Sequence, residues 1–260
     1  MHKIGVNYCK DFSMEPDSQF ALLSDIGFQS IFTSFDGLAE TEHYAVAAMD
    51  AHLMYESIHA PFDGINAMWQ EGDAGEHMLA RLCDCVDACK KNAVPYVVVH
   101  LSSGNHAPCV NDLGHSRFDR LIDHAVKNNV TVAFENQRKL ANLAFFMELY
   151  QDVRNAGFCW DTGHEACFAG GREYMPLFGN KLVCTHIHDN FSQPGGDLHL
   201  IPFDGNLDFE RRAKHLRDHR YTGTLTLEIA PHASNFYQGV SAEDYYQKAY
   251  AAALRLRAFL

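Results

Sequence analysis

The sequence lacks the features that mark several classes of protein. It has no run of about 18 apolar residues, which excludes a membrane-spanning helix. Residues 1–10 lack the apolar core, roughly 7–15 residues long, of a secretory signal peptide. We therefore expect a cytoplasmic protein whose eight cysteines are reduced.

Positive charge is also scarce. No run of Lys or Arg exceeds two residues, and 33 acidic against 21 basic residues give a formal net charge of −12. A chain of this charge is repelled by a phosphate backbone unless it carries a local basic patch or bound cations. The composition therefore does not favour a nucleic acid as partner, and the absence of an apolar span argues against a membrane.

The sequence does contain enough apolar residues for a large core. It is 47% hydrophobic and 21% charged, a balance that excludes disorder, collagen-like sequence and a coiled coil. Although 260 residues exceed the average domain, α/β barrels of about 200–250 residues form single domains. Because no linker, repeat or low-complexity segment divides the chain, we expect one domain over residues 1–260.

Eight β-rich segments alternate with helical patterns along the chain. The strand-like segments are 3–8, 30–35, 54–59, 96–101, 130–135, 157–161, 182–188 and 223–229. The helical segments are 18–26, 41–52, 75–93, 115–129, 139–154, roughly 171–180, 207–219 and 241–258. This repeat predicts an α/β fold of the (β/α)₈ TIM-barrel type. An open doubly wound sheet is less favoured because no GxGxxG follows the first strand.

Metal-capable side chains end or directly follow six consecutive predicted strands. In chain order they are His59, His100, Glu135, Asp161, His164, His186, His188, Asp197, His199 and Glu228. In a TIM barrel the C-terminal ends of the strands meet at one mouth, so we expect these side chains to converge there. Each alone would fit a structural residue, and the inference depends on their joint placement.

The expected cluster places Glu135, Asp161, Asp197 and Glu228 together without a Lys or Arg at any strand end. Like charges held a few ångströms apart cannot all stay ionised, and burial adds to that cost. Imidazoles and carboxylates without a fixed cation are the composition of a divalent metal site. We therefore predict a bound divalent metal ion, with Zn²⁺ or Mn²⁺ favoured and Co²⁺, Fe²⁺ or Mg²⁺ as alternatives.

The chain also resembles a known superfamily through motifs that occur in order along most of its length. They are HAPF at 59–62, His100, FEN at 134–136, DTGH at 161–164, HIHD at 186–189, DLH at 197–199 and LEI at 227–229. Together they resemble the xylose isomerase-like TIM-barrel superfamily, which groups sugar isomerases and epimerases with endonuclease-IV-type AP endonucleases. Two positions depart from its pattern: Phe203 replaces a loop glycine, and Ala141 replaces a glutamate of the ketohexose epimerases.

The two branches of this superfamily imply different sites. In the epimerase branch, the resemblance implies one metal held by Glu135, Asp161, His186 and Glu228, and the two glutamates also form the catalytic acid/base pair. His164 and His188 then bind substrate hydroxyls, with His59 and His100 as further substrate-binding candidates. In the endonuclease branch, the same four residues hold one metal. His59 and His100 hold a second with Glu135, and His164, Asp197 and His199 hold a third.

We accordingly expect a metal-dependent isomerase or epimerase that acts on a small keto-sugar or polyol ketone through an enediolate. Trp69 and Phe62, after the third strand, either wall the apolar face of the sugar or pack a short lid helix. Three alternatives stay open: a three-metal phosphodiesterase acting at abasic DNA sites, a metal-dependent sugar or inosose dehydratase, and a non-catalytic metal- or sugar-binding barrel. The resemblance also implies homo-oligomers.

Overall fold

The computed structural model describes residues 1–260 and contains one sheet of eight parallel strands. The strands are β1 (Ile4–Asn7), β2 (Ser30–Ser34), β3 (Met54–His59), β4 (Tyr96–His100), β5 (Thr131–Glu135), β6 (Ala156–Asp161), β7 (Leu182–His186) and β8 (Leu225–Leu227). They pair in chain order, and β1 also pairs with β8. The backbone N–H of Ile187 donates to Thr226 (2.9 Å) and closes the circle between β7 and β8. The predicted (β/α)₈ TIM barrel is confirmed.

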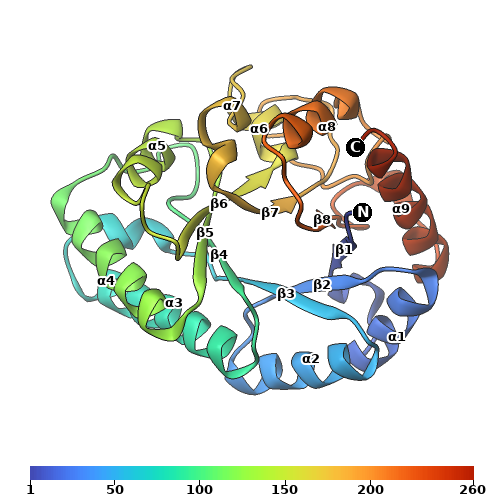
Figure 1. Cartoon of the computed structure of the whole chain (residues 1–260), viewed down its shortest axis with the longest axis horizontal. Helices are drawn as coiled ribbons and strands as arrows, with labels where there is room; N and C mark the ends of the chain where they lie inside the picture. The colour runs from blue at the N-terminus through green and yellow to red at the C-terminus, as the bar shows by residue number, and fades with distance from the viewer.

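Nine helices surround this barrel (Figure 1). They are α1 (Pro16–Ile26), α2 (Leu38–Asp50), α3 (Asp73–Lys91), α4 (Asp112–Asn128), α5 (Leu140–Leu149), α6 (Thr162–Phe168), α7 (Met175–Phe178), α8 (Phe209–Asp218) and α9 (Ala242–Arg257). Their sequences explain their ends: the Asn111 side chain caps α4 by accepting the Gly114 N–H, and Ser241 caps α9 in the same way. None of these helices has the length and apolarity needed to cross a membrane.

One predicted helix is wrong. The only α-helix in the segment 171–180 is α7, four residues long, because Gly170 and Gly171 adopt positive φ angles and Pro176, the second residue of α7, prevents an earlier helix start. The helix of this unit is instead α6, which starts directly after β6. Asp161 is its N-cap and accepts the backbone N–H of His164 at 2.6 Å. A metal-capable strand end therefore also serves as a helix cap.

The interior of the barrel is filled below its C-terminal rim. Side chains two residues apart on a strand point to the same face. The residues two positions before His100, Glu135 and Asp161 are therefore also directed inward. With the corresponding residue of β7 they form a buried apolar cluster, made of Val98, Ala133, Cys159 and Cys184. The polar strand ends consequently face solvent only through the rim.

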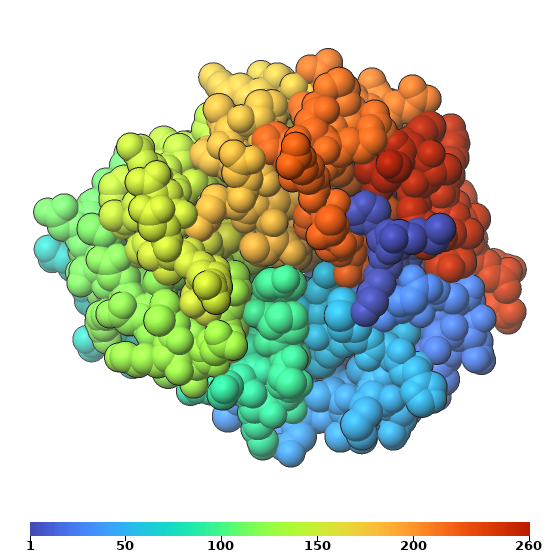
Figure 2. All heavy atoms as spheres, viewed as in Figure 1, coloured from blue at the N-terminus to red at the C-terminus, as the bar shows by residue number.

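The two ends of the chain lie side by side. Arg257, the last residue of α9, donates a hydrogen bond from Nη1 to the carbonyl of His2 (3.2 Å). In Figure 2 the first residues lie at the surface against the C-terminal helix. This contact joins the last helix to the residues just before β1, the strand that pairs with β8.

Candidate metal centre and active site

Strand register brings the predicted residues together at the C-terminal rim. His100 of β4 pairs with Glu135 of β5, and Asp161 of β6 pairs with His186 of β7. His59 is the last residue of β3, and Glu228 directly follows β8. Parallel strands end at the same edge of a sheet, so closure of the barrel gathers these side chains at one mouth.

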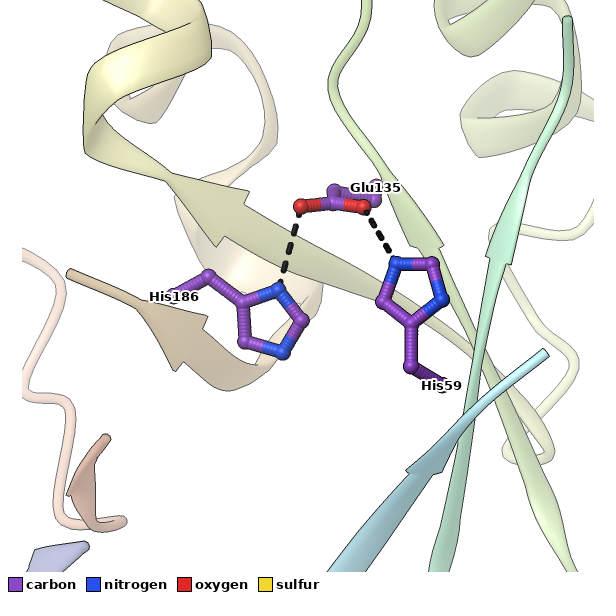
Figure 3. A group of neighbouring side chains, drawn as sticks. All are labelled: His59, Glu135 and His186. Carbon is purple, nitrogen blue, oxygen red and sulfur yellow. Dashed lines mark hydrogen bonds and ion pairs between the residues drawn. The ribbon is translucent and has the colours of Figure 1, made fainter. Parts of the chain in front are cut away.

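Glu135 lies at the centre of this group. Its side chain is fully buried, and histidines approach both carboxylate oxygens. Glu135 Oε2 lies 2.5 Å from His100 Nε2 and 3.3 Å from His59 Nε2, while Oε1 lies 3.1 Å from His186 Nδ1. In Figure 3 the His59 and His186 rings point toward this carboxylate from separate strands.

A second group forms around Asp197, in the loop after β7. Its Oδ2 lies 3.1 Å from His164 Nε2 and 3.5 Å from His199 Nε2. The three residues could hold a cation between them. Both predicted clusters, one around Glu135 and one around Asp197, are therefore assembled by the fold.

His188 is brought to the same mouth but is covered. Its Nε2 lies 3.0 Å from Asp161 Oδ1, and its ring stacks on His199 with centroids 4.0 Å apart. The residue has no exposed surface. The predicted role in binding substrate therefore requires movement of His199, and in this structure His188 orients Asp161.

A cavity of about 380 Å³ opens over the cluster. It is lined by His59, Phe62, His100, Ser103, Gly104, Gln137, Arg138, His164, Asp197, His199 and Glu228. Glu228 thus faces the cavity, with 17% of its side chain exposed, whereas Glu135 lies beneath the histidines. A volume of this order falls within the usual range of small-molecule sites.

No Lys or Arg neutralises the four carboxylates of the site. Every ion pair that Glu135, Asp161, Asp197 and Glu228 make is with an imidazole. Positive charge must therefore come from protonated histidines or from a bound cation. This is the charge balance that the sequence predicted.

The pKa values in the metal-free protein reflect this balance. Burial opposes ionisation of Glu135, but His100 and His186 hold the pKa of this carboxyl well below its usual range. Burial also lowers the pKa of His164, yet the Asp161 and Glu135 carboxylates outweigh it and raise that pKa to about 10. Protons on imidazoles thus supply positive charge where a divalent ion could supply it instead.

The donor set fits a divalent metal. In a tetrahedral site with bonds of 2.0–2.1 Å, ligand atoms lie about 3.3 Å apart. His186 Nδ1 is 3.1 Å from Glu135 Oε1 and 3.3 Å from Glu228 Oε2, although the buried Glu228 Oε2 has no aligned hydrogen-bond donor. One ligand atom each from Glu135, Asp161, His186 and Glu228 lie within 4.8 Å of one another. These four residues could hold one ion.

Two polar residues of the site were not predicted. Asn136 exchanges two 2.8 Å hydrogen bonds with the backbone of Asp161 and thereby fixes the end of β6. The Gln137 side-chain nitrogen lies 3.1 Å from His100 Nε2 and 3.0 Å from His164 Nδ1, so it connects the two clusters. Asn136 belongs to the FEN motif at 134–136, but the sequence assigned no site role to either residue; their position directly after the Glu135 strand end is the signal that could have marked both.

Asp189 anchors the loop that carries Asp197 and His199. Its buried carboxylate accepts four backbone N–H groups, including those of Phe203 and Gly205, both at 2.9 Å. Phe203 adopts a left-handed φ of 75°, which costs a side-chain-bearing residue about 1–2 kcal/mol. Its ring is held by Arg255, whose guanidinium lies 3.8 Å from the ring centroid. The glycine replacement noted in the sequence therefore leaves an ordered loop.

Trp69 does not lie where the substrate-binding prediction requires. It is 3% exposed, packs against Phe118 and Phe146, and donates its indole N–H to the Leu101 carbonyl at 2.7 Å. The packing alternative therefore describes Trp69, because its large ring fills the space between the β3 loop and α4. Phe62, in contrast, is 44% exposed and lines the cavity.

Comparisons with known proteins agree with this architecture. Residues 20–255 match the family described as xylose isomerase-like TIM barrel. The uncharacterized protein y4fM of Sinorhizobium fredii is 30% identical in an alignment that covers 84% of this chain and 78% of that protein.

Solved structures show the same fold. The 3-keto-D-glucoside 4-epimerase YcjR of E. coli superposes with a TM-score of 0.76 at 17% identity, over 99% of this chain and 100% of that one. The D-psicose 3-epimerase of Clostridium cellulolyticum H10 gives a TM-score of 0.79 at 14% identity, over 99% of both chains. The family match, which spans nearly the whole barrel, shows that the chain belongs to the xylose isomerase-like TIM-barrel family.

Proposed function

We propose that this protein is a divalent-metal-dependent epimerase or isomerase of a small keto-sugar or polyol ketone. The observation that carries the proposal is the pair of glutamates on either side of His186, gathered with Asp161 at the mouth of the barrel. Two structural neighbours, YcjR and the D-psicose 3-epimerase, are sugar epimerases, which supports an epimerase reaction here.

The residues that would hold the metal are Glu135, Asp161, His186 and Glu228. When bound, the ion supplies a Lewis acid that polarises the substrate carbonyl. Glu228 lines the cavity, so its carboxylate is placed to remove the proton from the carbon next to that carbonyl. His59 and His164 line the same cavity and are placed to bind substrate hydroxyls.

Glu135 is assigned the second acid/base role. Its carboxylate contacts the cavity-lining His59 and His100 rather than the cavity itself. His100 Nε2 contacts Glu135 Oε2, and the His100 side chain lines the cavity, so this imidazole lies between the Glu135 carboxylate and the substrate. Return of the proton on the same or the adjacent carbon distinguishes epimerisation from isomerisation, and loss of a neighbouring hydroxyl would make the enzyme a dehydratase.

The test is proton exchange. The metal-loaded protein is incubated in D₂O with a panel of keto-sugars and inositol-derived ketones, and deuterium next to the carbonyl is measured by NMR. We expect incorporation with at least one member, loss of it after exhaustive chelation, and recovery on adding Mn²⁺, Zn²⁺ or Co²⁺. Full activity after chelation would contradict metal dependence. If none of the ketones incorporated deuterium, the proposed chemistry would be contradicted.

A second function is favoured by one specific observation. Beside the four-residue group, the fold brings His59 and His100 to Glu135, and it brings His164 and His199 to Asp197. Three such groups are what the endonuclease branch requires for hydrolysis of a phosphodiester at an abasic site. The net charge of −12 argues against a DNA substrate, so we rank this function second. A metal content near three per chain, with cleavage of an abasic duplex, would reverse the order.

A further inference from the structure

Arg138 is the one Lys or Arg side chain that lines the cavity. Its Nε is buried and has no hydrogen-bond partner, and its guanidinium forms no ion pair. The buried Arg117 shows how this chain satisfies such a group: it donates to the Glu76 carboxylate and to the carbonyls of Ala67 and Gln70, among others. Arg138 thus keeps free donors that Arg117 does not have.

Phe168 fixes the place of this guanidinium. The Arg138 Cζ lies 3.7 Å from the centroid of the Phe168 ring, a cation–π contact that covers one face of the guanidinium. The same phenyl ring packs against His164, with centroids 5.4 Å apart. Phe168 therefore separates the Arg138 charge from the His164 ring on the same cavity wall, and the guanidinium has no hydrogen-bond acceptor from the protein.

The chemistry of the Arg138 guanidinium indicates which kind of ligand group it binds. A guanidinium presents a planar fork of donors that matches the two oxygens of a carboxylate or phosphate, whereas a neutral sugar hydroxyl uses one donor at a time. The carboxylates of the site form ion pairs only with imidazoles, and none of them forms an ion pair with Arg138. An anionic group on the ligand would supply the missing partner.

We propose that Arg138 binds an oxyanion, a carboxylate or a phosphate, at the end of the substrate remote from its reacting carbonyl. The substrate class is then an anionic keto-sugar rather than a neutral one. This inference rests on the proposed function, because it uses the cavity over Glu228 as the substrate site.

Binding is tested on the metal-loaded protein by calorimetry with three probes: fructose, fructose 6-phosphate and 5-keto-gluconate. We expect one anionic probe to bind at least about tenfold more tightly than fructose, and the better one identifies phosphate or carboxylate. Arg138→Gln should abolish that advantage and leave fructose affinity unchanged. Arg138→Lys should retain only part of it, because an ammonium carries the charge without the fork.

Lys139→Gln is the matched control. It removes the same charge one residue away, and the Lys139 ammonium donates to the Ala107 carbonyl at 3.1 Å rather than lining the cavity. We expect this variant to bind all three probes like the original protein. An equal loss in Lys139→Gln would overturn the inference, since it would indicate a general effect of charge.

Two other results would overturn it: equal affinity of the original protein for all three probes, or an anionic advantage that survives in Arg138→Gln. The second would place the anion on the metal. If Arg138→Gln does not fold, the comparison rests on Arg138→Lys, which must lose part of the advantage. Failure of the proposed function is separate, because it appears as absence of deuterium exchange while the Arg138-dependent binding persists.

Discussion

Glu135 Oε2 lies 2.5 Å from His100 Nε2, and the two residues are register partners at the ends of β5 and β4. This pairing encloses Glu135, whose side chain has no exposed surface, whereas Glu228 keeps 17% exposure toward the cavity. The two glutamates are therefore not equivalent. Glu135 is bound by imidazoles from three strands, and Glu228 is the carboxylate that a ligand meets.

Glu228→Gln tests the role of the exposed member of the pair. The amide keeps the shape and one oxygen ligand but cannot accept a substrate proton, so we expect turnover to fall by about 10²–10⁴-fold. Circular dichroism and thermal melting should show an intact fold. Glu243→Gln, at an exposed glutamate of α9, is the matched control and should be fully active. Unchanged activity of Glu228→Gln would remove this residue from the mechanism.

His199→Ala separates the two functions. In a one-metal epimerase, His199 is not a ligand, so metal content measured by mass spectrometry should stay near one per chain. In a three-metal phosphodiesterase, loss of its contact with Asp197 should remove one ion of three. We expect the first result. His77→Ala, at an exposed position of α3, controls for loss of an unrelated imidazole.

Metal affinity should rise with pH. Burial lowers the pKa of His199, but Asp197 and Glu228 raise it to about 9, and the pKa of His164 is about 10. Any imidazole that a metal ligates must first lose its proton. His186, whose pKa also lies well above its usual value, is the ligand in both functions. We therefore expect the logarithm of the metal association constant, measured by chelator competition between about pH 6.5 and 8.5, to rise by about one per pH unit for each proton displaced. A flat profile would contradict the protonated state.

The same shifts fix the pH dependence of the metal-free protein. A histidine whose folded pKa is raised stabilises the fold fully below its unfolded pKa, about 6.5, and loses that contribution as pH rises through the folded value. The window for His164 and His199 is therefore roughly pH 6.5 to 10. We expect the melting temperature of the chelated protein to fall across this window and the metal-loaded protein to change less. A melting temperature that increases with pH would be the opposite result.

The sequence was informative about the barrel because its signals are periodic and local. Eight short β-rich segments and the position of polar residues at their ends both survive into the structure. Asn136 and Gln137 could not be assigned in this way, since their roles come from contacts with Asp161, His100 and His164 on other segments. The fold brings such partners together, and spacing along one strand does not show them.

Trp69 and α6 are two further features that tertiary contacts decide and that the local sequence does not show. Trp69 follows β3, where an aromatic residue can face either the cavity or the outer core, and only the packing of Phe118 and Phe146 decides. The sequence places Asp161 at the end of a predicted strand and His164 just beyond it, and the structure shows that Asp161 is also the N-cap of α6. Local sequence could not distinguish a capping carboxylate from a candidate metal ligand, because Asp161 caps α6 and also contacts His188 in the polar cluster.

Trp69→Phe and Phe62→Ala should affect different properties. Trp69→Phe removes the indole N–H that donates to Leu101 and leaves a gap in the core, so we expect unfolding free energy to fall by about 1–3 kcal/mol. Its affinity for a ketose ligand should not change. Phe62→Ala should weaken ligand binding with a stability change within about 0.5 kcal/mol, because that ring is half exposed. If Trp69→Phe instead weakened ligand binding and left stability unchanged, Trp69 would be a substrate-binding residue after all.

Gly163→Ala tests whether α6 sets the position of His188. A Cβ at Gly163 would clash with the His188 ring, so the ring must leave its place beside Asp161. We expect a loss of about 1–3 kcal/mol in urea unfolding and weaker metal binding. Because the clash is with one side chain, His188→Ala should relieve it, and the double variant should be no less stable than His188→Ala alone. Additive losses in that cycle would show that the alanine disturbs the α6 backbone instead, and that the helix does not position His188 through this contact.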